Sequence, residues 1–376
     1  MSVAAASEKL RRKYRILVAP LDWGLGHATR CIPIIAELLR NDCDVWLAGE
    51  GTQESLLRSE FPSLPFLPLE GYNIRYSKSK KMFSLKIISQ IPRIVFLIRK
   101  EHGWLNKAVS AHGFDAVISD NRFGLHHRKI ISIFMTHQLQ IKSSLGKWSE
   151  KILRSWNYKH IERFTECWIP DYRGDQNLAG QLSHPDREPQ IPLRYIGLLS
   201  RLEKGQSIQI PNHLLFILSG PEPQRTIFEN KIIDDISHYP GTATIVRGLP
   251  SISSILPSTG MIKFYNHLPQ QQLSEEMTKA EWIISRSGYS TVMDIVKLGK
   301  KSILIPTPGQ TEQEYLAKHL AENHIAFTIP QDKFSLNNAL NGAKAIRYDF
   351  LNLGGSNELG STVKNFLNRL SVGQKK

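Results

Sequence analysis

Short apolar runs alternate with amphipathic stretches in the first half of the chain. TRCIPIIAELL has the spacing of a helix that buries one face, and four runs have the composition of buried strands: YRILVAP, DVWLAG, FDAVISD and IISIFM. Strands that alternate with helices are typical of a parallel sheet with crossover connections. We therefore predict a doubly wound α/β domain.

The same rhythm restarts in the second half. Four further runs resemble strands, and helical segments follow the first, third and fourth of them: HLLFILSG, GTATIVRG, AEWIISRSG and KSILIPTPG. The stretch IGLLSRLEKGQSIQIPN between the halves is rich in polar and turn residues, which places a boundary near Gly205. We predict two Rossmann-like domains, residues 1–204 and 205–376, facing a cleft, with the final helix at 357–370 crossing back.

Composition fits this picture, because 376 residues exceed what one hydrophobic core usually supports. The three cysteines, Cys31, Cys43 and Cys167, are odd in number and far apart, so neither a disulfide framework nor a metal-ligand spacing is indicated. The first fifteen residues lack a signal-peptide core, and no apolar run has the length of a membrane span. We expect a cytoplasmic protein.

Positive charge is concentrated in one segment. The formal net charge is +14, and residues 72–107 contain nine basic residues against Glu101 alone. The same segment includes FSLKIISQIPRIVFLIRK, where apolar and basic residues interleave and Pro92 interrupts a helical pattern. Such a segment can lie at an anionic membrane surface without spanning it. The alternative is a core helix with a basic outer face.

The first strand runs into a glycine-rich turn. In APLDWGLGHATR, Gly24 and Gly26 permit a tight turn, and His27 begins the following helix. A turn of this kind presents backbone amides and a helix N-terminus to a polar or anionic ligand. A dinucleotide fingerprint would need a third glycine and an acidic residue at the end of the second strand, where Gly49 stands, so a nicotinamide enzyme is disfavoured. Alternatively, His27 has only a structural hydrogen bond.

Two strand-to-helix turns in the second half have the character of nucleotide sites. In LSGPEPQR, Ser219 and Gly220 can turn the chain, and Gln224 or Arg225 can face phosphate. In AEWIISRSGYSTVMDIVKLGKKSILIPTPGQTEQEYLAKHL, the turn at 287–288 opens a helix that contains Asp294. Amides at such a turn can hold a diphosphate, and a carboxylate further along can accept hydrogen bonds from ribose hydroxyls. Taken singly, each of these residues could be structural.

The order and spacing of these motifs resemble those of the GT-B glycosyltransferases, and within them glycosyltransferase family 28, which includes the bacterial enzyme that adds N-acetylglucosamine to lipid I. The resemblance is strong over about residues 214–320 and is carried by Ser287, Gly288 and Thr291, with Asp294 in place of the family's Glu. In the first half only the Gly-His turn is similar, and it departs from the family's Gly-Gly-His. Glu314 replaces the second of two family glutamines.

The resemblance implies a nucleotide-sugar donor, UDP-linked, held by the second domain. Residues 287–289 would hold the diphosphate, Asp294 the ribose, and Gln313 and Glu314 the sugar, with 266–268 near the base. The donor-binding set is Ser219, Gly220, Gln224, Arg225, His267, Leu268, Arg286, Ser287, Gly288, Tyr289, Ser290, Thr291, Asp294, Gln310, Gln313 and Glu314.

The acceptor is expected in the first domain. Polar residues follow two strands there, in ISDNRFGLHHRK and THQ, in place of the family's glycine-rich acceptor loop. Because carboxyl ends of parallel strands share one edge, these residues are predicted to line the cleft. The acceptor-binding set is Gly24, Gly26, Asp120, Asn121, Arg122 and His137. Alternatively, the loop residues are merely solvated. We expect the acceptor to be a hydroxyl group of a lipid-linked substrate or a glycan.

No cofactor and no metal are expected. Asp42-Cys43-Asp44 spells a DxD, but it precedes a strand and so lies at the wrong end of the sheet. Backbone amides, a helix dipole and Arg225 or Arg286 would offset charge on the departing diphosphate, and His27 would remove the acceptor's proton. This scheme predicts inversion at the anomeric carbon.

Two other functions stay open. A nucleotide-sugar 2-epimerase resembles this architecture, but the acid and base carboxylates that it needs are not identifiable. A non-enzymatic anion-binding protein would fit the charge alone. Nucleic acid is disfavoured as a partner, since the basic segment lacks evenly interleaved aromatics and any recognised binding motif.

Overall fold

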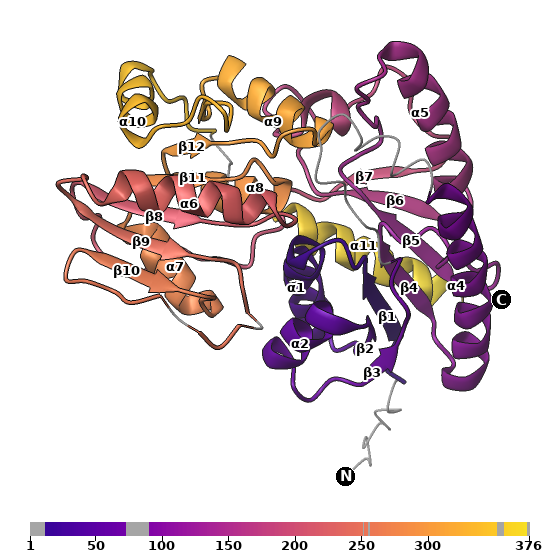
Figure 1. Ribbon diagram of the computed structural model, residues 1–376. Coiled ribbons are helices and arrows are strands. Elements are labelled where there is room, and N and C mark those ends of the chain that lie inside the picture. Colours follow the sequence, from indigo (N-terminus) through magenta and orange to yellow (C-terminus); the bar gives the residue numbers. More distant parts are fainter. Residues whose placement is uncertain (1–11, 73–89, 251, 255, 352–356, 374–376) are drawn as a thin grey trace, which may run out of the picture.

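Two parallel sheets, each covered by helices, form the protein in this computed structural model (Figure 1). The structure describes residues 12–72, 90–250, 252–254, 256–351 and 357–373. The predicted fold class, two Rossmann-like domains, is confirmed. The predicted boundary near residue 205 falls in the segment that connects the last strand of the first sheet to the first strand of the second.

The first sheet has the strand order β3-β2-β1-β4-β5-β6-β7. Its strands are β1 (Arg15–Pro20), β2 (Asp44–Gly49), β3 (Phe66–Pro68), β4 (Ala116–Asp120), β5 (Ile131–Met135), β6 (Glu166–Ile169) and β7 (Leu193–Tyr195). The helices of this domain are α1 (Leu25–Arg40), α2 (Gly51–Glu60), α4 (Ile91–His112) and α5 (Lys147–Ile161). Alternate residues of β1 face opposite layers, so that Ile16 packs toward α1 and Leu17 toward α4.

The second sheet has the order β10-β9-β8-β11-β12-β13. Its strands are β8 (His213–Ile217), β9 (Thr242–Val246), β10 (Ile262–Tyr265), β11 (Trp282–Ser285), β12 (Ser302–Leu304) and β13 (Phe327–Thr328). Its helices are α6 (Gln224–Ile236), α7 (Gln270–Lys279), α8 (Tyr289–Lys297), α9 (Thr311–Glu322) and α10 (Leu336–Ala345). In both sheets the order reverses beside the first strand, which creates the crevice where ligands bind in such folds.

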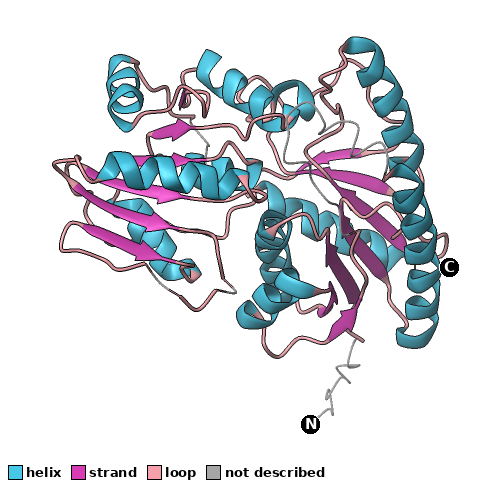
Figure 2. Cartoon of the chain, in the orientation of Figure 1, coloured by secondary structure: helices cyan, strands magenta, loops and turns pink. Residues whose placement is uncertain are grey.

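One apolar cluster crosses from the first domain to the second. It includes Ile34 of α1, Leu199 of the connection, Val292 of α8 and Phe366 of α11 (Glu358–Gly373). Figure 2 shows the final helix running from the second domain back along the first. There Arg369 forms an ion pair with the fully buried Glu166, with Nη2 and Oε1 2.6 Å apart. The interface between the domains is therefore an extension of the core.

Several short strands were not predicted. β6, β7 and β10 have only three or four residues each. β10 also follows a polar stretch that ends before Ile262, so no strand was predicted there. The basic segment gives a helix from Ile91 onward, with Pro92 in its first turn, where its missing N–H costs nothing. Residues 73–89, which carry five of the nine basic residues, lie outside the described part of the chain.

Candidate active site at the domain interface

His27 lies in the first turn of α1, at the carboxyl end of β1. Gly24, just before the helix, has φ of +85°, a conformation that favours glycine and lets the chain reverse into the helix. β1 pairs with β4 in a register that sets Pro20 beside Asp120. The two strand ends therefore bring the His27 ring to Asp120, with Nδ1 and Oδ2 3.0 Å apart.

Arg30 lies one helical turn after His27 and grips the same carboxylate. Its Nε donates to Asp120 Oδ2 at 2.8 Å, and its Nη2 donates to Oδ1. Asp120 is fully buried and Arg30 is 2% exposed. Burial alone would raise the pKa of Asp120, but the Arg30 guanidinium and the His27 ring outweigh it, and the pKa lies below its ordinary value. Asp120 is an anion here.

The His27 side chain is mostly enclosed, with 15% of its surface exposed. Burial and the neighbouring Arg30 lower the pKa of His27, and the attraction of Asp120 does not offset them. The ring is therefore neutral at neutral pH. A neutral imidazole whose Nδ1–H donates to a carboxylate has a free lone pair on Nε2, which is the form that can accept a proton.

His137 follows β5 and joins this group to the second domain. Its Nδ1 lies 3.1 Å from Arg30 Nη1, and its Nε2 lies 2.7 Å from Oε1 of Glu312 on α9. Its ring also stacks on Tyr289 of α8, with centroids 4.2 Å apart and planes inclined by 7°. Two separate elements of the second domain thus contact one histidine of the first.

The predicted diphosphate turn docks directly on the first domain. Gly288 precedes α8, and Ser290 in the first turn donates from Oγ to Gly26 O at 3.0 Å. The Tyr289 hydroxyl donates to Pro170 O at 2.8 Å. Ser287 Oγ donates to Gln313 O at 2.8 Å, which links the turn to α9. Thr291 follows in the same first turn and is half-buried. The N-terminus of α8 therefore points at the start of α1.

Asp294 lies further along α8, beside the connection between the domains. Ser200 donates a short hydrogen bond to its Oδ1, and Lys297 Nζ donates to the Ser200 carbonyl at 2.9 Å. Burial raises the pKa of Asp294 to about 6, although Ser200, Arg201 and Lys297 act against it. A carboxylate that costs this much to ionise gains most from a ligand that donates hydrogen bonds to it.

The start of α9 closes over the preceding loop. Gln313 Oε1 accepts from Thr307 N at 2.9 Å, and Gln313 Nε2 donates to Gln310 Oε1 at 2.5 Å. Glu314 accepts from Gly309 N at 3.0 Å. All of these side chains are half-buried at the same edge as α8, so the predicted sugar-contacting residues are gathered beside the predicted diphosphate turn.

The turn after β8 places its charges differently from the prediction. Gly220 has φ of +102° and is exposed beside Ser219 and Gln224. Arg225 is buried in ion pairs with Glu222 and Glu229, at 2.6 and 3.1 Å. Its charge is already offset within the protein, so this geometry does not favour a phosphate role for Arg225.

Arg286 differs from Arg225 in its partners. It is 1% exposed, lies over the Phe228 ring at 4.5 Å, and donates to Gln224 O at 2.8 Å and Gln331 Oε1 at 2.6 Å. No carboxylate partner is found for it in the described ranges. Burial lowers the pKa of Arg286 to about 10, which still leaves it cationic at neutral pH. The positive charge sits one residue before the diphosphate turn.

The predicted base-contacting residues follow β10. Asn266 is buried and accepts from Arg247 Nη1 at 2.9 Å, and Leu268 is part of the core that joins the domains. His267 between them is half-buried, and burial together with Arg201 lowers its pKa. Leu268 and His267 thus lie beside the same connection as Asp294.

Arg122 corrects the predicted acceptor set. The side chain is 1% exposed, and its Nε donates to Glu101 Oε1 of α4 at 2.5 Å. Its Nη1 and Nη2 donate to the carbonyls of Pro20 and Glu70. Arg122 therefore holds α4, the end of β1 and the loop at Glu70 together instead of facing a ligand. Asn121 turns the chain with φ of +56° and is half-buried next to Asp120.

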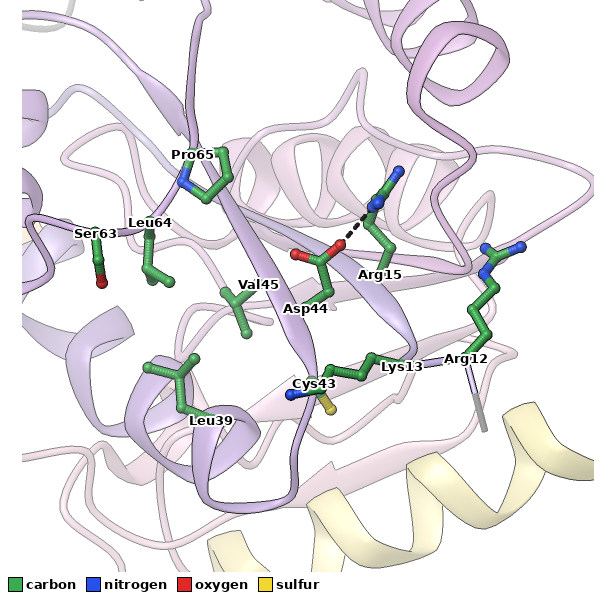
Figure 3. A pocket seen from close by; sticks show the side chains of 10 residues that line it. All are labelled: Arg12, Lys13, Arg15, Leu39, Cys43, Asp44, Val45, Ser63, Leu64 and Pro65. Carbon is green, nitrogen blue, oxygen red and sulfur yellow. Dashed lines mark hydrogen bonds and ion pairs between the residues drawn. The ribbon is translucent and has the colours of Figure 1, made fainter. Parts of the chain in front are cut away.

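The Asp42-Cys43-Asp44 motif lies at the opposite end of the sheet from His27. Asp42 pairs with Lys13 and Asp44 with Arg15, and these side chains line or adjoin a hollow at the amino ends of β1 and β2 (Figure 3). Among the residues that the structure describes, no group of three or more His, Cys, Asp or Glu side chains is arranged to hold a metal ion. Because the hollow lies at the amino ends of these strands and His27 follows the carboxyl end of β1, the hollow is separate from the candidate site.

Two residues of the candidate site, Arg30 and Glu312, were not predicted from the sequence. A usable signal existed for Arg30, because residues three apart on a helix share a face and His27 was already a candidate base. Glu312 stands among predicted sugar-contacting residues but faces the other domain, which only the three-dimensional structure reveals.

Comparisons with known proteins agree with this arrangement. A family model for the glycosyltransferase family 28 C-terminal domain matches residues 261–346. Over 350 residues, 86% of each chain, the protein is 24% identical to the UDP-N-acetylglucosamine--N-acetylmuramyl-(pentapeptide) pyrophosphoryl-undecaprenol N-acetylglucosamine transferase of Francisella philomiragia.

Solved structures share the fold. The glycotransferase of kitacinnamycin superposes with a TM-score of 0.63 at 13% identity over 96% of both chains. MurG of Acinetobacter baumannii gives 0.50 at 11% identity over 97% of this chain and all of the other. A UDP-N-acetylglucosamine 2-epimerase structure from Listeria monocytogenes gives 0.56 at 10% over 97% of both. The architecture is thus the GT-B fold, which these transferases share with an epimerase.

Proposed function

We propose that this chain, which has the GT-B fold and matches the glycosyltransferase family 28 C-terminal domain over residues 261–346, is a glycosyltransferase that transfers a hexose or N-acetylhexosamine from a UDP-sugar to an acceptor hydroxyl, with inversion and without a catalytic metal. The observation that carries this proposal is the buried His27–Asp120 pair, which faces the diphosphate turn of the other domain. Sugar transfer needs a base for the acceptor hydroxyl and a site that stabilises the departing diphosphate. In this proposal the first domain supplies the base and the second domain the anion site.

His27 is the general base in this proposal. Asp120 accepts the Nδ1 proton and so leaves Nε2 free to take the proton of the acceptor hydroxyl. The hydroxyl oxygen then attacks the anomeric carbon from the face opposite the diphosphate. One displacement of this kind inverts the anomeric configuration.

The second domain stabilises the leaving group. The first-turn amides of α8 and the positive end of that helix face the position proposed for the diphosphate, and the buried cation Arg286 comes immediately before this turn in the sequence. Fixed dipoles and a buried cation can offset the charge that develops on departing UDP. These groups supply the function that a divalent ion serves in metal-dependent transferases.

The acceptor is proposed to be lipid-linked or a glycan, reached at an anionic membrane surface. The relative from Francisella is named for transfer to a pyrophosphoryl-undecaprenol compound. In this chain α4 exposes Phe96 (64%) beside Arg99 and Lys100, and α5 exposes Trp148 (75%) and Ile152 (50%). Leu97 of α4 is nonetheless buried. The helix is therefore part core and part exposed apolar surface.

The two helices are neighbours, since Trp156 of α5 packs against the cluster that contains Leu97 and Ile98 of α4 (Figure 1). Among the described residues, no helix combines the length and the apolar character needed to cross a bilayer. Exposed aromatic side chains flanked by lysine and arginine are typical of proteins that bind to the membrane interface.

A donor screen tests the proposed function. UDP-, GDP- and dTDP-sugars are added in EDTA, and the melting temperature is measured. A ligand at 100 times its dissociation constant stabilises by about 2.7 kcal/mol, so a UDP-sugar should give a clear shift. Stabilisation by another nucleotide alone would contradict the donor assignment. Conversion of the UDP-sugar into its epimer, with no UDP released, would favour the epimerase alternative.

A further inference from the structure

We propose that Arg30 is a positioning residue whose guanidinium competes with Asp120 for His27 Nδ1, and that Glu312 of the second domain, acting through His137, restrains the guanidinium so that the ring proton stays on Nδ1. The proposal rests on the proposed role of His27 as the base. It adds that the base is competent only while the two domains are docked as they are here.

Two groups of opposite character compete for one nitrogen. His27 Nδ1 lies 3.0 Å from Asp120 Oδ2, an acceptor, and 2.8 Å from Arg30 Nη2, a donor. A neutral ring nitrogen either carries a proton or has a lone pair, so it cannot satisfy both. If Nδ1–H donates to Asp120, Nε2 is a base. If Nδ1 accepts from Arg30, the proton moves to Nε2 and the base is lost.

The position of the guanidinium decides between these tautomers. Arg30 is pinned on one side by Asp120 and on the other by His137, whose Nδ1 accepts from Nη1 at 3.1 Å. Without the contact to His137, Asp120 and His27 are the partners that the guanidinium keeps among the described residues. It would then be free to turn further toward His27 Nδ1.

His137 owes its own orientation to the second domain. A donor at Nε2, 2.7 Å from Glu312, leaves Nδ1 as an acceptor for Arg30, so the directions of the hydrogen bonds agree along the chain. Burial would raise the pKa of Glu312, but His137 and Arg30 outweigh it and keep it an anion. The stack on Tyr289 fixes the plane of the ring.

The charged and titratable groups around His27 come from four elements. Arg30 and Cys31 lie on α1, Asp120 ends β4, His137 follows β5, and Glu312 lies on α9. The Cys31 thiol, with Sγ 3.9 Å from Asp120 Oδ2, stays protonated because burial raises its pKa. Arg30 is the nearest cation, and it opposes protonation of His27.

The test reads His27 directly by NMR of ¹⁵N-labelled histidine side chains in the full chain without substrate. The signal is identified by its loss in His27→Gln. In the unmodified protein, His27 should be neutral with its proton on Nδ1 at pH 7. In Arg30→Gln, loss of the cation should raise the measured pKa by about one pH unit or more.

His137→Phe separates the two parts of the proposal. A phenyl ring keeps the stack on Tyr289 but makes no hydrogen bond to Arg30 or Glu312. The Nε2–H tautomer of His27 should therefore gain population in this variant. Arg30→Lys keeps the positive charge but lacks the two-pronged guanidinium. In this variant the pKa of His27 should stay near its value in the unmodified protein, while the tautomer of His27 shifts as in His137→Phe.

Arg369→Gln is the matched control, because it also removes a cation from a fully buried carboxylate, Glu166, but away from His27. It should leave the His27 signals unchanged. An unshifted pKa in Arg30→Gln, or an unchanged tautomer in His137→Phe, would overturn the proposal. These NMR measurements need no sugar transfer, so they can confirm or contradict this proposal even if the proposed reaction is not observed.

Discussion

At the scale of single residues, the candidate site depends on two side chains, His27 and Arg30, that share the carboxylate of Asp120. Asp120 contacts both His27 and Arg30, and it is fully buried. Removing one partner of a buried ionic group costs more than removing an exposed one, because the remaining charge stays desolvated. Substitutions here therefore have to be interpreted together with a measurement of folding.

Replacing His27 by Ala should reduce turnover by about 10²- to 10⁴-fold, since proton transfer by a positioned base contributes that much. Donor affinity should change little, because the ring belongs to the first domain. Steady-state kinetics with calorimetric donor binding would check both. Turnover close to that of the unmodified protein would leave His27 with a structural role only.

Replacing Asp294 by Ala should weaken donor binding by roughly 1.5–3 kcal/mol, the contribution of hydrogen bonds to a charged group. The pKa of about 6 adds a pH dependence. Above pH 6 the carboxylate is ionised and accepts from ribose. As the pH falls below 6 the group is protonated and affinity should decline.

The alanine variant supplies its own control, because it has no carboxyl to titrate at this position. Its donor affinity should be flatter between pH 5 and 8 than that of the unmodified protein. If both proteins show the same pH profile, Asp294 does not contact the donor.

At the scale of elements, the starts of helices α1 and α8 meet at the interface between the domains. A Cβ on Gly26 of α1 would come within 2.9 Å of Ser290 Oγ of α8. The Gly-His turn could be predicted from the sequence because it is a local motif. Its contact with Ser290 of the second domain could not be predicted, because it joins residues that are far apart in the chain. Motif spacing predicts local turns, but it does not predict which turns face each other.

Gly26→Ala should therefore lower the free energy of unfolding by about 1–3 kcal/mol, the usual cost of overpacking. In a Ser290→Ala background the obstruction is gone, and the same change should be neutral or stabilising, because Ala exceeds Gly in helix propensity by about 1 kcal/mol. Urea unfolding of the four proteins measures the reversal. Equal effects in both backgrounds would mean that α1 and α8 do not meet as described.

α4 and α5 are expected to bind anionic membranes. Liposomes with anionic lipid should co-sediment the protein at low salt and release it at high salt, because each lysine or arginine near the surface contributes about 1 kcal/mol. A Phe96→Ser, Trp148→Ser double variant should bind more weakly. Ile208→Ser changes a side chain that is 86% exposed in the connection between domains, and it serves as the control. Equal sedimentation of both variants would contradict the assignment.

The sequence predicted the strands that lie in long apolar runs and missed several strands that do not. β8, β9, β11 and β12 were predicted from apolar runs, since strands buried on both faces have continuous apolar stretches. β10 has four residues, including the exposed Lys263, so its sequence lacks the continuous apolar run that predicts a buried strand. Arg122 was misassigned because its place after a strand does not reveal that Glu101 draws it inward.

At the scale of the whole molecule, the two domains share one core and one site. The apolar cluster that runs through Leu199 and Phe366 keeps the domains in register, so His137 of the first can contact Glu312 of the second. The resemblance over residues 214–320 supplied the motifs of the donor half, and the donor-binding residues assigned from it stay predictions. The acceptor half has fewer motifs, and its assignment had to wait for the geometry around Asp120.

The most direct test of the central claim is calorimetric titration of UDP into the protein in EDTA and again in Mg²⁺. The account predicts binding of equal affinity in both, since amides of α8 and the cation of Arg286 replace a metal, and weaker binding by Asp294→Ala. Binding that appears only with Mg²⁺, or no binding of UDP in either buffer, would contradict it.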